Sequence, residues 1–363
     1  MYALQTIPHG VGMGCGGNFG LIGRPLRTEQ RGVRILLLLL MAVRVAIAAP
    51  ASPPMQSIDI RLGVDGAHNA PQGLPKAYRA TRKVLRTFRR SESRRFVMLS
   101  DLSDNEAAAH LQLLERTAHA VEDFRRRLDL ADSPEVRTRK MLAVAFGSRA
   151  DFLWFANQHD DLAADWMSGY FAPEPGRLVY YHAQDLPGAK RAMRTLEQRG
   201  TSSEALASFL AQSTAAVVVH EAAHMILHEE GILPANSGVP LWLAEGVAAS
   251  FEPVNASRTF GPLKRENGRT KSFEEDVRDG TVPPLEVLVS SLVLPGGGEA
   301  AVRKFYDASA SFCSWLARDR PEALARVIHA SRTGRVGHDR AGRVEAFEFL
   351  VGPIDAIEAA FSS

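Results

Sequence analysis

The feature that most constrains this chain is a long stretch of apolar and small residues in the middle of the sequence. It runs from Ala205 to Leu227, and Thr201 with Glu204 three residues later forms a capping box in front of it. Gly231 is a suitable stop residue just beyond its end. The pattern therefore predicts one long helix, which opens a helical second half of the chain.

Inside this stretch, two histidines and a glutamate stand among apolar residues: the segment reads His220, Glu221, Ala222, Ala223, His224. Residues four apart share one face of a helix, so the two imidazoles can reach a single metal ion. Glu221 is rotated by about 100° from His220, which suits it to hold a water beside the metal rather than to act as a ligand. Zinc lowers the pKa of such a water to roughly 7, so a carboxylate can take its proton.

A catalytic zinc site needs a third protein ligand and an open position. His228 continues the same face, but its Cα lies about 12 Å along the axis from that of His220, too far for one ion. The segment that begins with Pro240, a residue suited to the first turn of a helix, predicts a helix to about Phe251. Glu245 is an acid in this otherwise apolar segment. A buried carboxylate is costly unless it is paired or bound to metal. We expect Glu245 to be the third ligand, and an ion pair with an arginine is the alternative.

The preceding residues alternate between strand and helix patterns. Short apolar runs predict strands at Phe96–Leu99 and Met141–Phe146. Capping patterns predict helices that begin after Ser103 and after Ser148. Two further strands joined by a Pro-Glu-Pro-Gly turn predict a hairpin, at Tyr170–Phe171 and Arg177–His182. These elements indicate a small mixed sheet with helices.

The last part of the chain is predicted to be helical after one long loop. Residues 253–284 are polar and contain Pro and Gly, which predicts the loop. Helices are expected around 285–293, 300–318 and 321–331.

The N-terminal residues have the pattern of a secretory signal peptide. A group of arginines precedes an apolar run at Ile35–Val43, and Ala46 and Ala48 supply small residues for cleavage. The run is shorter than the roughly 20 residues that span a bilayer. We therefore expect an exported protein, periplasmic or extracellular, with no transmembrane segment after cleavage.

Charge and cysteine content restrict the function further. The formal net charge is +2, and the arginine-rich first 48 residues account for that excess, so composition gives no reason to expect nucleic-acid binding. Nine Lys or Arg stand between Lys76 and Arg95, a segment that we interpret as a solvated helix face rather than a contact with an anionic surface. Cys15 would leave with the signal peptide, and Cys313, among aromatic residues, is interpreted as a small buried side chain rather than a nucleophile.

The spacing of the ionisable residues resembles that of a known enzyme class. His-Glu-x-x-His, about twenty intervening residues, and then the run Trp242 to Gly246 are similar to the gluzincin zinc metallopeptidases. The nearest likeness is to the peptidase-MA-like exported bacterial proteins, many of unknown function. Weaker similarities flank these motifs, over Phe146–Arg149 and Gly169–Phe171 upstream and Ser309–Phe312 downstream. The resemblance extends over residues 95–320 approximately.

This resemblance implies one Zn²⁺ ion per chain, with His220, His224 and Glu245 as ligands and Glu221 as general base. It also implies that Arg177–His182 is an edge strand beside the cleft, along which a peptide substrate could bind through its backbone.

Two further roles follow from the resemblance. Gluzincins often use a Tyr or His to stabilise the oxyanion, and Tyr306 fits that position, with His329 and His338 as weaker alternatives. Some gluzincins carry an acid four residues after the third ligand to orient a ligating histidine. Ala249 stands there in this chain, so Glu252 or a backbone carbonyl would have to take that role.

We therefore expect an α+β, zincin-like fold: a small mixed-sheet lobe followed by a helical lobe, with the active-site helix between them. The expected divisions are a signal peptide (1–48), a linker and basic segment (49–94), an α/β lobe with an edge-strand hairpin (95–200), zinc-binding helices (201–260) and a C-terminal helical lobe (261–363). The expected function is a zinc-dependent metallopeptidase, an endopeptidase acting on peptides or proteins. The alternatives are an inactive zinc-containing binding or scaffold protein of the cell envelope, and hydrolysis of a non-peptide amide.

Overall fold

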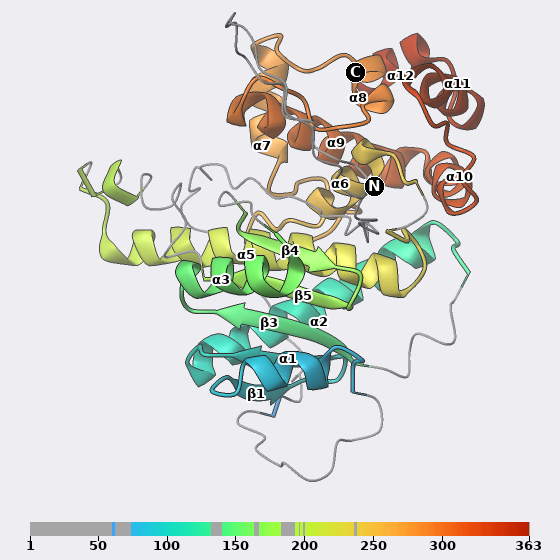
Figure 1. Cartoon of the computed structure of the whole chain (residues 1–363). Helices are drawn as coiled ribbons and strands as arrows, with labels where there is room; N and C mark the ends of the chain where they lie inside the picture. The colour runs from blue at the N-terminus through green and yellow to red at the C-terminus, as the bar shows by residue number, and fades with distance from the viewer. Residues whose placement is uncertain are drawn as a thin grey trace, which may run out of the picture.

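The structure is a computed structural model that describes residues 60–61, 74–131, 140–162, 167–182, 193–195, 197–198, 200–235 and 238–362. The predicted signal peptide lies outside these residues and stays a prediction. Within them the fold is mixed α+β, with a five-stranded sheet and many helices (Figure 1). None of the described helices is both long enough and apolar enough to cross a membrane.

The sheet has the strand order β1-β2-β3-β5-β4. Its central strands β2, β3 and β5 are parallel, and β1 and β4 pair antiparallel at the two sides. The five strands are β1 (Arg89–Glu92), β2 (Phe96–Ser100), β3 (Met141–Phe146), β4 (Gly169–Ala172) and β5 (Arg177–Tyr181). The predicted strands and hairpin are confirmed, whereas β1 lies inside the basic segment that we interpreted as helix.

The position of the edge strand differs from the prediction. Arg177–His182 was expected at the edge, but β5 lies between β3 and β4, so β4 is the edge strand on that side. Strand order depends on contacts between distant segments, and the hairpin sequence fixes only that its two strands pair. The prediction that Arg177–His182 is the edge strand is therefore wrong.

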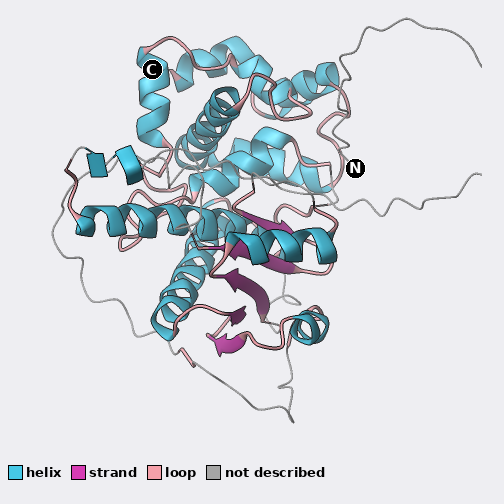
Figure 2. Cartoon of the chain, turned by 60° about the vertical axis from the view of Figure 1, so that its left-hand side comes forward, coloured by secondary structure: helices cyan, strands magenta, loops and turns pink. Residues whose placement is uncertain are grey.

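The two faces of the sheet are covered by different helices (Figure 2). Along β2, Phe96 and Met98 join the core with α2 (Asp104–Arg127) and α5 (Ser203–Glu229). The alternate residues Val97 and Leu99 join a second core, with α1 (Tyr78–Val84) and α3 (Arg149–Asp160). Successive side chains of a strand point to opposite faces, so continuously apolar strands indicate burial on both sides.

Helix ends follow the predicted capping patterns with one shift. Ser103 and Glu106 form the predicted capping box of α2, and Ser148 accepts a hydrogen bond from the backbone N–H of Asp151 at the start of α3. At α5, however, the cap is Ser202, whose hydroxyl accepts from the Ala205 N–H, and not the predicted Thr201. Two adjacent hydroxyl residues satisfy the same pattern, so the sequence alone does not choose between them.

The C-terminal half is helical, and in Figure 1 these helices lie on the other side of α5 from most of the sheet. The predicted loop at 253–284 is wrong in part, because α7 lies within it. A helix with few apolar residues gives a weak signal, and α7 depends on its contacts with α9. The helices are α6 (Leu241–Ser250), α7 (Thr270–Arg278), α8 (Leu285–Ser290), α9 (Glu299–Asp319), α10 (Pro321–Arg332), α11 (Arg340–Leu350) and α12 (Ile354–Phe361).

Several cations of the basic segment are used inside the fold. Arg82 donates to three backbone carbonyls, those of residues 85, 86 and 88. Arg90 pairs with Glu92, and Arg95 pairs with Glu115 and Glu122 of α2. The prediction of a solvated helix face is therefore wrong in part, because the helix ends at Val84 and Arg90 is buried in an ion pair on β1.

Candidate metal centre

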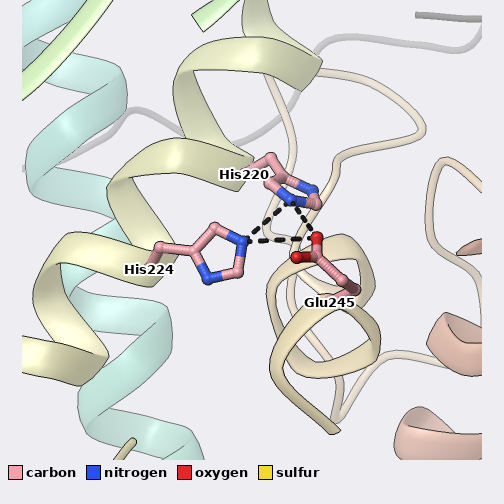
Figure 3. Close-up of side chains that lie close together, drawn as sticks. All are labelled: His220, His224 and Glu245. Atoms are coloured by element: carbon pink, nitrogen blue, oxygen red, sulfur yellow. Dashed lines mark hydrogen bonds and ion pairs between the residues drawn. The ribbon is translucent and has the colours of Figure 1, made fainter. Parts of the chain in front are cut away.

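The structure brings the three predicted ligands together at the junction of α5 and α6. His220 and His224 lie one turn apart on α5, and Glu245 extends from α6 toward both of them (Figure 3). The two Nε2 atoms are 3.0 Å apart, and Glu245 Oε2 lies 3.4 Å from that of His220 and 3.6 Å from that of His224. All three side chains are buried.

These distances fit a common metal ion. Ligand bonds of about 2.0–2.1 Å at tetrahedral angles would separate two donor atoms by ~3.3 Å. Among the described residues, no hydrogen-bond donor with normal geometry reaches the buried Glu245 Oε2, although two imidazole nitrogens face it. Buried carboxylate oxygens are normally satisfied. The group His220–His224–Glu245 could therefore hold a metal ion.

A close helix contact holds Glu245 in place. The next residue, Gly246, faces α9, where a Cβ atom would come within 2.5 Å of the Ser309 carbonyl oxygen and 2.8 Å of Cys313 Sγ. Only a residue without a side chain allows α6 and α9 to pack this closely. The distance between these two helices therefore helps to set the position of the carboxylate.

Glu221 lies beside the candidate ligands with both carboxylate oxygens buried, and no side chain of the described residues hydrogen-bonds them. Burial raises the pKa of Glu221 to about 8, and the nearby His220 opposes this rise. A backbone contact from Phe171 on β4 also favours the charged form. The Glu221 side chain packs against β4, where a Cβ on Gly169 would lie 3.2 Å from Glu221 Cγ. A buried carboxylate that lacks side-chain hydrogen bonds is costly unless a cation or a water complements it.

The outer nitrogen of His220 also has a carboxylate partner. His220 Nδ1 lies 2.9 Å from Glu252 Oε1, and Arg269 binds both oxygens of Glu252. Burial alone would lower the pKa of His220, but Glu245 and Glu252 outweigh it and raise the pKa to about 9. Of the two alternatives for orienting this histidine, the structure selects Glu252 over a backbone carbonyl.

The pKa values of the other two residues of this group are both lowered, whereas that of His220 is raised. Burial lowers the pKa of His224 to about 4. Burial would raise the pKa of Glu245, but the two neighbouring imidazoles lower it to about 2. A neutral imidazole and an ionised carboxylate are the forms that bind metal.

Tyr306, the predicted oxyanion donor, lies at the centre. Its ring centroid is 5.9 Å from that of His220, and it is fully buried on α9. Burial raises the pKa of its phenol well above the ordinary value, and a hydrogen bond with Glu245 raises it further. The phenol therefore keeps its proton and can donate it in a hydrogen bond.

Other candidate residues lie elsewhere. His228 is not part of the metal-binding group found among the described residues, and its Nδ1 accepts a hydrogen bond from the Ala235 N–H. His329 and His338 are exposed. Cys313 is buried, and burial raises its thiol pKa, as expected for a packing residue.

Sequence reasoning assigned no role to three residues that shape this centre: Gly169 and Gly246, which it quoted only within motifs, and Arg269. The two glycines act by allowing close contacts with residues far away in sequence. Arg269 lies in a polar segment, and nothing in the sequence distinguishes it from the neighbouring basic residues.

The comparisons with known proteins assign no activity to this chain. Residues 214–335 match a family described as a protein of unknown function, DUF1570. The matched range includes the two histidines, Glu245 and Tyr306. A comparison with curated proteins finds no match.

Proposed function

We propose that this protein is a zinc-dependent metallopeptidase with a zincin-like arrangement, and that it acts as an endopeptidase. The observation that carries the proposal is a buried carboxylate, Glu221, which no side chain of the described residues hydrogen-bonds and which stands next to a group that could hold a metal. A structural metal site has no need of such a carboxylate, whereas hydrolysis needs a base.

The roles of the residues follow from their chemistry. His220, His224 and Glu245 would hold the ion, which when bound polarises a carbonyl and lowers the pKa of water to about 7. Glu221 would take the proton from the attacking water and pass it to the leaving amine. Burial raises the pKa of Glu221, and a bound cation would lower it again, which suits a group that takes and then returns a proton. Tyr306 would donate a hydrogen bond to the oxyanion.

The substrate would bind along β4 rather than β5. β4 is the edge strand, it contacts α5, and Gly169 at its start lies against Glu221. A peptide added antiparallel to this strand would gain backbone hydrogen bonds. Its scissile bond would then lie beside the general base.

The first test is the metal content of the purified chain, measured by elemental analysis after reconstitution, for wild type and Glu245→Ala. We expect about one zinc per wild-type chain and a large loss in the variant. Two histidines and one carboxylate also occur in iron oxygenases, so preferential iron binding, or no metal at all, would contradict the proposal.

The second test separates catalysis from metal binding. Glu221→Gln removes the base but keeps the size of the side chain, so zinc should stay bound while cleavage of a mixed peptide library falls by 10² or more. Glu204→Gln, at an exposed position of the same helix, is the matched control and should cleave at the wild-type rate. Zinc binding without any cleavage by the wild type would instead favour the scaffold function.

A further inference from the structure

Behind the candidate metal-binding group, buried and half-buried side chains of alternating charge connect α5 to the C-terminal helices. Glu252 lies against His220 Nδ1, and Arg269 donates to both of its oxygens at 2.7 Å, through Nε and Nη2. Arg269 Nη1 reaches Asp307 Oδ1 at 3.4 Å, and Arg303 donates to the other oxygen of Asp307 at 2.7 Å. Arg269 is thus the cation closest to the centre in this row.

The backbone of Arg269 is also fixed. Its N–H donates to Asn267 Oδ1 at 2.8 Å, and Asn267 Nδ2 donates to Ser314 Oγ of α9 at 3.1 Å. The guanidinium carbon lies 5.5 Å from the centre of the Tyr306 ring, over its face. One buried arginine therefore contacts both the carboxylate behind His220 and the phenol beside it.

The charges show why the centre needs this cation. Glu221, Glu245 and Glu252 bring three carboxylates into one buried region, whereas a divalent ion balances only two. Arg269 offsets the third, because its buried guanidinium donates to both oxygens of Glu252 at 2.7 Å. The Glu252 carboxylate can accept a hydrogen bond from His220 Nδ1–H at 2.9 Å, and this tautomer leaves the Nε2 lone pair free for a metal.

We infer that Arg269 is a positioning residue of the metal centre, which orients the ligand His220 through Glu252 and holds the ring of Tyr306. The inference rests on the proposed metal centre, but it does not depend on peptide hydrolysis. It requires that loss of the guanidinium changes the metal site itself, and not only the stability of the fold.

A second buried arginine supplies a matched control. Arg177 on β5 binds both oxygens of Asp160, at 2.5 and 3.3 Å, and the hydroxyl of Tyr170 donates to the same carboxylate. Its guanidinium lies 4.7 Å from the centre of the Phe155 ring. A buried arginine that binds a carboxylate and lies over an aromatic ring therefore also occurs in the core on the other face of the sheet, away from the candidate metal ligands.

The experiment compares Arg269→Lys and Arg269→Gln with Arg177→Lys. Zinc affinity is measured by competition with a chelator, the ligand geometry by the visible spectrum of the Co²⁺ form, and stability by thermal unfolding of the metal-free chain. We expect Arg269→Gln to weaken zinc binding by 10- to 100-fold and to change the cobalt spectrum. Arg269→Lys should recover part of the affinity, because an ammonium keeps the charge but cannot form the paired hydrogen bonds.

The control decides the interpretation. Arg177→Lys should lower the unfolding midpoint and leave zinc affinity and the cobalt spectrum unchanged. If Arg269→Gln does not fold, the double variant Glu252→Gln with Arg269→Gln removes both charges and should show the same loss of zinc affinity. Wild-type affinity and spectrum in the Arg269 variants, or an equal loss of zinc in Arg177→Lys, would overturn the inference. A wild type that binds zinc but cleaves no peptide would overturn the proposed function alone.

Discussion

The contact between α6 and α9 gives the sharpest prediction about this protein. Changing Gly246→Ala adds a single methyl group, at a point 2.5 Å from the Ser309 carbonyl oxygen and 2.8 Å from Cys313 Sγ. Ordinary contact begins at 3.4 Å, so the two helices must separate by about 0.9 Å, because a backbone carbonyl in a helix cannot rotate away. The adjacent residue, Glu245, has to move with α6.

The size of this shift sets the expected effects. Metal–ligand distances tolerate about 0.2 Å, so a shift of this size should weaken zinc binding at least tenfold, about 1.4 kcal/mol. Overpacking costs about 1–3 kcal/mol, and alanine in place of glycine in a helix returns about 0.5–1 kcal/mol. The metal-free variant should therefore be destabilised by up to about 2.5 kcal/mol.

Urea unfolding of the metal-free chain and zinc competition measure these two quantities separately. Gly296→Ala is the control, since its Cβ would meet no atom within 4 Å, and it should match the wild type in both. If Gly246→Ala bound zinc as tightly as the wild type and was equally stable, the argument that this contact positions Glu245 would be refuted.

Three other predictions concern the surroundings of the centre. Gly169→Ala places a Cβ 3.2 Å from Glu221 Cγ and 2.9 Å from Val217 Cγ1, so peptide turnover should fall on the order of tenfold while zinc stays bound; an unchanged rate would contradict the role of this contact. Burial lowers the pKa of His110 to about 4, so the free energy of unfolding should fall as the pH drops from about 6.5 toward 4, because the unfolded chain binds the proton more tightly. His110→Gln should reduce that fall when urea unfolding is compared at pH 7 and pH 5, and an identical fall would refute the assignment. Buried Cys313 should react with a thiol reagent only after the chain unfolds, and rapid labelling of the native protein would show that its packing is wrong.

Much of the structure could be predicted from patterns within a few neighbouring residues. The boundaries of β3 and the caps at Ser103 and Ser148 depend on a few neighbouring residues, and the structure has them as predicted. The position of His220 and His224 on one face follows from helix geometry alone. Glu245 was found because an acid in an apolar helix needs a partner.

Other features of the fold were not predicted, because they depend on contacts between residues far apart in the chain. The helix α7 lies in a segment that was expected to be loop, and the edge position of β4 depends on where the hairpin docks on β3. Neither choice is encoded within one segment, because tertiary contacts supply most of the stability of a short helix or strand.

The sequence by itself determined the chemistry that this protein can offer: two imidazoles and a carboxylate on one helix, and a second carboxylate about twenty residues later. Only the tertiary structure decided how these groups meet. The contact of Gly246 with α9 sets the position of Glu245, Gly169 lets β4 approach Glu221, and Arg269 offsets the charge of Glu252. The side-chain spacing along a helix is a local property, whereas close approach and charge balance in a buried site depend on which distant segments pack together.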